Sequence, residues 1–176
     1  MQLNVVQELA ARTLLVILAA AVVQDFMYMK ISNRLILMGI LFSLAFGLTT
    51  GGPKQVIYVL ANLSFPVIVL YLLYLLGVLG AGDIKLFSII GGFTNFRLLI
   101  SCMFFSFVAA AVIAVCKMLY NRNFCGSLLR AGTYFRSLRQ EGIVSYHKEW
   151  AEHRNLMHFS VAILIGYIAA VAVQVL

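Results

Sequence analysis

Apolar stretches of about twenty residues, separated by short polar breaks, dominate this sequence. Hydrophobic residues fill 63% of the 176 positions, charged residues fill 11%, and the mean hydropathy is +1.00. A soluble domain carries charge at roughly a quarter of its positions, whereas a helix that crosses a bilayer needs about 20 apolar residues. The sequence therefore predicts an all-α integral membrane protein with membrane lipid as its main solvent, forming one domain over residues 1–176.

The polar breaks divide the chain into about six transmembrane helices, one of them short. We predict helices over residues 7–28, 35–49, 55–79, 84–93, 98–119 and 156–176. Pro66 lies inside the third of these and predicts a kink. Residues 84–93 rise only about 15 Å as a helix, less than the roughly 30 Å hydrocarbon core. We therefore expect a half-length helix that its neighbours shelter from lipid.

Basic residues indicate the orientation in the membrane. With the N-terminus outside, ten Lys and Arg residues fall in cytoplasmic segments and three (Arg12, Lys54 and Arg97) fall outside. Lys and Arg collect in the cytoplasmic loops of membrane proteins, so this rule accounts for the net charge of +7 without nucleic acid as a partner. We expect a multi-pass protein of the cell membrane, the inner or cytoplasmic one. Residues 120–155 have two open interpretations, an amphipathic helix on the inner leaflet or a solvated loop.

Two aspartates, Asp25 and Asp83, are the only ones in the chain, and both lie at the predicted cytoplasmic ends of helices. An acidic side chain in or beside a bilayer is costly, so each indicates a function. Of two neighbouring carboxylates one keeps its proton, and such a pair can activate water and assist at a carbonyl. Taken alone, each has a plainer interpretation: Asp83 as a helix cap, and Asp25 as the partner of a nearby cation.

No metal or cofactor is needed for this chemistry, and the sequence suggests none. The three cysteines are Cys102, Cys116 and Cys125, and no two of them have the spacing of a zinc site or a disulfide framework. The three histidines all come late in the chain, from position 147 on, and form no credible Ser-His-Asp set with the aspartates. The two carboxylates are therefore the candidate reactive groups.

The segments around both aspartates resemble the type IV prepilin peptidase family. The family's second motif, Gly-x-Gly-Asp-x-Lys, is matched throughout by residues 80–85, Gly-Ala-Gly-Asp-Ile-Lys. Its first motif is an Asp near a helix end, followed by a basic residue and Ile-Pro-Asn, and it is fitted by Asp25, Lys30, Ile31, Asn33 and Leu35, with Ser32 in place of the Pro. Residues 158–166 look like the family's C-terminal segment without its prolines.

The resemblance implies a GxGD-type intramembrane aspartyl protease. Asp25 and Asp83 would be the catalytic pair, with Gly80, Gly82, Lys85 and Asn33 as structural support and no metal or cofactor. The substrate would be the leader peptide of a prepilin, cleaved after a Gly at the cytoplasmic membrane face, and pilus assembly machinery would be a partner. Because the N-terminal methyltransferase region with its paired cysteines is missing, the chain looks like the short form of Tad or Flp pili, similar to archaeal preflagellin peptidases.

Two other classes of function stay open. A small transporter or channel subunit could use Asp25 and Asp83 in an ion path. The predicted position of both residues at one membrane face argues against this class, because transporter sites usually lie near the midplane. A non-catalytic subunit of a pilus or secretion machine would be favoured by an altered motif, but both aspartates are present.

Overall fold

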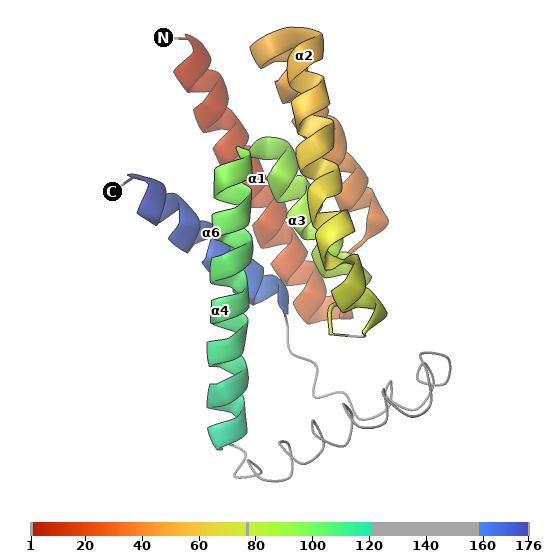
Figure 1. Ribbon diagram of the computed structural model, residues 1–176, viewed down its shortest axis with the longest axis vertical. Helices are drawn as coiled ribbons and strands as arrows, with labels where there is room; N and C mark the ends of the chain where they lie inside the picture. Colours follow the sequence, from red (N-terminus) through yellow and green to blue (C-terminus); the bar gives the residue numbers. More distant parts are fainter. Residues whose placement is uncertain (1, 77, 121–158, 176) are drawn as a thin grey trace. The chain divides into compact units, whose positions relative to one another are not determined.

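The computed structural model describes residues 2–76, 78–120 and 159–175, and every secondary-structure element in these ranges is an α-helix. The elements are α1 (Gln2–Tyr28), α2 (Asn33–Leu75), α3 (Ala81–Phe93), α4 (Phe96–Tyr120) and α6 (Phe159–Val175), as labelled in Figure 1. Among the described residues, three helices (α1, α2 and α4) are long and apolar enough to cross a membrane. The predicted all-α membrane protein is confirmed at this level, whereas the surface helix considered for residues 120–155 falls almost wholly outside the described ranges.

The chain divides into two compact units. One comprises residues 1–109 and 158–176, and the other comprises residues 110–157, of which the structure describes the end of α4. Both aspartates and α6 belong to the first unit, and all the contacts described below lie within it. The single domain expected over residues 1–176 stays a prediction.

Helix α2 is a hairpin of two helical arms, seen as the orange-to-yellow element that doubles back in Figure 1. Its backbone leaves the helical region only at Gly52, where φ is +65° and ψ is −154°, torsions that glycine adopts readily. A Cβ added at Gly47 would lie 3.0 Å from Cγ2 of Val59, so the arms pack against each other. The arms correspond to the predicted helices 35–49 and 55–79. The helix also continues through Pro66, where the sequence predicted a kink.

Helix α3 has the half-length character expected from the sequence, since its 13 residues rise only about 20 Å. Its end lies beside the second arm of α2, where Nδ2 of Asn62 donates a hydrogen bond to the carbonyl oxygen of Thr94 at 3.2 Å. This contact matters because unpaired backbone groups are costly at membrane depth. Eight of its residues, 84 and 86–92, are buried. Neighbouring helices therefore shelter α3, as predicted.

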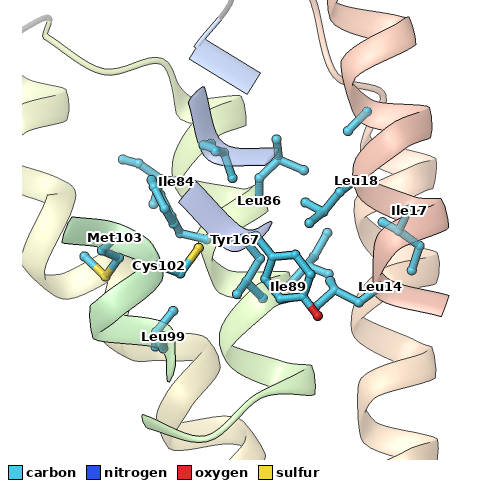
Figure 2. Packing of buried hydrophobic residues seen from close by; sticks show 14 of the residues in the cluster. Leu14, Ile17, Leu18, Ile84, Leu86, Ile89, Leu99, Cys102, Met103 and Tyr167 are labelled. Carbon is cyan, nitrogen blue, oxygen red and sulfur yellow. The ribbon is translucent and has the colours of Figure 1, made fainter. Parts of the chain in front are cut away.

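The core of this unit is built around α3 from side chains of α1, α2, α4 and α6. Figure 2 shows side chains of α1 (Leu14, Ile17, Leu18), α3, α4 (Leu99, Cys102) and α6 (Tyr167) meeting in one cluster. Glycine makes the helix crossings close: a Cβ added at Gly166 of α6 would lie 2.5 Å from the backbone nitrogen of Ser106 in α4. Small residues of this kind let membrane helices approach closely. The packing fixes the N-terminal ends of α3 and α6, which carry the candidate site.

Candidate active site

Asp25 lies in the last turn of α1, and a tight loop leads the chain from it into α2. The amide of Met29 donates to the carbonyl oxygen of Asp25 at 2.9 Å, and Met29 itself has a positive φ of 51°. The amide of Ser32 donates to Oε1 of Gln24 at 3.0 Å, which ties the loop back onto α1. The carboxylate of Asp25 is half-buried at this turn.

Ser32 stands where the family motif has a proline, and it makes two hydrogen bonds that a proline could not make. Its φ of −69° is a value that proline would also hold. Its hydroxyl oxygen accepts a hydrogen bond from the amide of Leu35 at 3.3 Å and so caps α2. Its own N–H, which proline lacks, is the donor to Gln24. The departure from the family pattern therefore keeps the backbone torsion and adds two local hydrogen bonds.

Asp83 is the third residue of α3 and not its N-cap. It does cap the helix, but from inside the first turn of a helix that begins at Ala81 and not at Ile84. The N-cap is Gly80, in an extended conformation with φ −78° and ψ 149°. Oδ2 of Asp83 accepts a hydrogen bond from the amide of Gly80 at 3.2 Å. A Cβ at Gly80 would lie 3.1 Å from the same oxygen. Glycine at this position therefore leaves room for the half-buried carboxylate.

The two motif segments touch each other, although about fifty positions separate them in the sequence. Nζ of Lys85 donates to Oδ1 of Asn33 at 2.9 Å. One turn earlier on α3, a Cβ at Gly82 would lie 3.3 Å from Cδ1 of Ile31. Lys85 and Asn33, two of the expected structural supports, are thus in contact across the two motifs. They place the start of α3, with Asp83, beside the loop that follows Asp25.

A third segment reaches the site from the far end of the chain. Ser160, in the first turn of α6, donates its hydroxyl hydrogen to Oδ2 of Asp25 at 2.6 Å. Its side chain is 1% exposed. Asp25 therefore accepts a hydrogen bond from a residue 135 positions away. Within the part of the chain that the structure describes, no three His, Cys, Asp or Glu side chains form a group that could hold a metal ion.

A known protein family matches the part of the chain that carries both aspartates. The family model described as the type IV leader peptidase family matches residues 13–115, which is more than half of the chain. The chain belongs to the type IV leader peptidase family. This membership indicates a leader peptidase with prepilin-type substrates. The matched residues contain both aspartates but end before α6, and no curated protein and no solved structure matches the chain.

Two residues of this candidate site were not singled out by the sequence. Ser160 lies in the segment 158–166 that resembles the family's C-terminal region, but nothing local marks it as a partner of Asp25. Gln24 anchors the loop after Asp25 through its side-chain oxygen. The available signal was a polar side chain inside an apolar helix, because such a side chain needs a hydrogen-bond partner when it is buried. That signal identifies a candidate but not its partner.

Proposed function

We propose that the chain is an intramembrane aspartic endopeptidase that removes the leader peptide from prepilin-like precursors. Asp25 and Asp83 are its catalytic pair, and Gly80, Gly82, Lys85 and Asn33 hold the two aspartates' segments together. The observation that carries this proposal is the contact between the two motif segments, through the 2.9 Å hydrogen bond from Lys85 to Asn33. Family membership supplies the substrate class, and the contact supplies a reason for both motifs to form one site.

The reaction needs one ionised and one protonated carboxyl group. The ionised carboxylate removes a proton from water as the water oxygen attacks the carbonyl carbon of the scissile peptide bond. The protonated carboxyl group donates a hydrogen bond to the carbonyl oxygen, where negative charge develops. When the tetrahedral intermediate collapses, the C–N bond breaks and a proton passes to the leaving amine. A pair of aspartates supplies both roles because neighbouring carboxylates do not ionise together.

The membrane placement that we propose follows the distribution of basic residues. Lys30, Arg34 and Lys85 lie in the two segments that carry the aspartates. Their positive charge favours the cytoplasmic side of the membrane for these segments. The two arms of α2, together with α1, α3, α4 and α6, would give six membrane helices of a GxGD-type protease, with α3 the short one. The site then acts at the cytoplasmic face of the cell membrane.

We propose that the prepilins the chain cleaves belong to Tad or Flp pili, in line with the resemblance found in the sequence. Pilus assembly machinery would then take up the cleaved product in the membrane. We propose no metal or cofactor, since the two carboxylates provide the base and the acid of the reaction.

The test is a co-expression cleavage assay. A candidate prepilin from the same genome, with a basic leader and a Gly before its apolar segment, is expressed with wild-type protein, with Asp25→Asn or with Asp83→Asn. We expect a leader-sized decrease in mass with the wild type only, because each amide removes a proton-transfer group from the pair. Both variants should insert into the membrane in normal amounts, measured by membrane fractionation.

Two outcomes would contradict the proposal. Turnover by either Asp→Asn protein would refute the assignment of the catalytic pair. Lack of cleavage by correctly inserted wild-type protein, across several candidate prepilins, would favour an ion path or an assembly role for the two aspartates instead.

A further inference from the structure

The buried polar side chains of the described residues are all serines, and one of them differs from the rest. Three donate their hydroxyl hydrogens to backbone carbonyl oxygens in their own helices: Ser43 to Ile40, Ser88 to Ile84 and Ser106 to Cys102. Such a bond satisfies the hydroxyl group within its own helix and does not link that helix to another one. Ser160 instead donates to the carboxylate of Asp25 on another helix.

The first turn of α6 is held firmly enough to place this hydroxyl group. The ring of Phe159, the residue before Ser160, lies 6.3 Å from the ring of Phe87 in α3 and 5.9 Å from that of Phe107 in α4. Phe87 is fully buried. Two turns further along α6, Gly166 packs directly on the backbone of Ser106. Movement of Ser160 relative to the core would therefore disturb aromatic packing and a close helix crossing.

We infer that Ser160 is a positioning residue for Asp25, so that α6 completes the catalytic site. The inference rests on the proposed function for its meaning. The carboxylate of Asp25 can rotate about two side-chain bonds. Proton transfer during the attack by water requires that the carboxylate oxygens point in a defined direction. A donor at 2.6 Å fixes Oδ2, and hydrogen bonds to a charged acceptor are the stronger kind. The family match covers residues 13–115 of the chain, so it does not include Ser160 and does not assign this role.

The first test compares Ser160→Ala with Ser88→Ala. Both substitutions remove one buried hydroxyl group, and the side chains are 1% and 3% exposed. With purified full-length protein and a prepilin substrate, we expect kcat of Ser160→Ala to fall about 10- to 100-fold while KM changes little. The reason is that the serine orients one member of the catalytic pair and does not hold substrate. Ser88→Ala should keep the kcat and KM of the wild type.

A second test needs no activity. The chain contains only two aspartates, so protein labelled with 13C at the Asp side-chain carboxyl carbon gives two carboxyl signals. In Asp83→Asn only the signal of Asp25 remains, which assigns it. Ser160→Ala removes the hydrogen bond to Asp25 and should shift the Asp25 signal. Ser88→Ala keeps that hydrogen bond and should leave the Asp25 signal unchanged. This readout separates a lost contact at Asp25 from a general loss of fold, which would move both aspartate signals.

The results separate this inference from the proposed function. If the wild type cleaves prepilin and Ser160→Ala has a shifted Asp25 signal with a lowered kcat, the inference holds. An unshifted signal, or a kcat within about twofold of wild type, refutes it, since twofold is less than any hydrogen bond to a charged group contributes. Absence of cleavage by the wild type refutes the proposed function, and a normal Asp25 signal in Ser160→Ala would then also refute the contact.

Discussion

Gly91 offers the most direct test of how α3 is placed. Pro66 has no N–H, so the carbonyl oxygen of Asn62 four residues earlier lacks its usual donor within the helix. Gly91 of α3 packs against this carbonyl group: an added Cβ would overlap the oxygen of Asn62 and lie 3.0 Å from its carbonyl carbon. The perturbation is Gly91→Ala, which inserts one methyl group at this contact.

The expected magnitude follows from two opposing effects. Alanine stabilises a helix interior by about 1 kcal/mol relative to glycine. Forcing an extra methyl group into a packed core costs about 1–3 kcal/mol. The cost at Gly91 should reach the upper end of that range, because the obstacle is backbone and cannot rotate away. We therefore expect a net loss of about 2 kcal/mol in the free energy of unfolding, together with lower activity because α3 carries Asp83.

The matched control is Gly47→Ala, where the added Cβ meets one methyl group of Val59 at 3.0 Å and otherwise makes ordinary contacts. Its stability should stay within about 1 kcal/mol of wild type, since the helix gain offsets a small strain. Unfolding can be followed through the thiol of Cys102, which is fully buried, after Cys116 and Cys125 are replaced by serine. Equal stability of the two glycine variants in a denaturant series would refute the close backbone contact.

Two further substitutions test the site itself. Lys85→Ala removes the hydrogen bond to Asn33. We expect kcat/KM to fall about 3- to 10-fold, a much smaller loss than for either Asp→Asn protein. An unchanged kcat/KM would show that the contact does not support the site. Gly80→Ala adds a methyl group 3.1 Å from Oδ2 of Asp83 at torsions that alanine accepts, so cleavage should decline while the thiol-monitored unfolding curve stays that of the wild type.

The helices were predictable because the signals that define them are local. The turn at Gly52 and the apolar segments on either side gave both arms of α2, and the polar segment after Asp25 gave the end of α1. The start of α3 was placed too late, at residue 84, whereas the helix begins at Ala81. The reason is a side-chain contact: the carboxylate of Asp83 accepts from the Gly80 amide and so supports an earlier first turn.

The buried face of each helix could not be predicted from sequence periodicity. In a soluble protein a helix shows an apolar stripe toward the core and polar residues toward water. In lipid both faces are apolar: on α1, Leu14 is fully buried and Val16 is 68% exposed, yet both are aliphatic. The glycines that set the helix crossings at Gly91 and Gly166 are therefore informative only when their neighbours are known.

The same reasoning explains why half of the candidate site was visible in the sequence and half was not. Asp25 and Asp83 stand out because ionisable groups are rare and costly in apolar helices. A buried serine costs little free energy in such helices, because its hydroxyl group can donate a hydrogen bond to a carbonyl oxygen of the previous turn, as at Ser88 and Ser106. Ser160 is also a buried serine in an apolar helix, so its residue type and surroundings in the sequence look like those of the other buried serines. Its acceptor in the structure is Asp25, which lies 135 positions away, and no local sequence pattern indicates a partner at that distance.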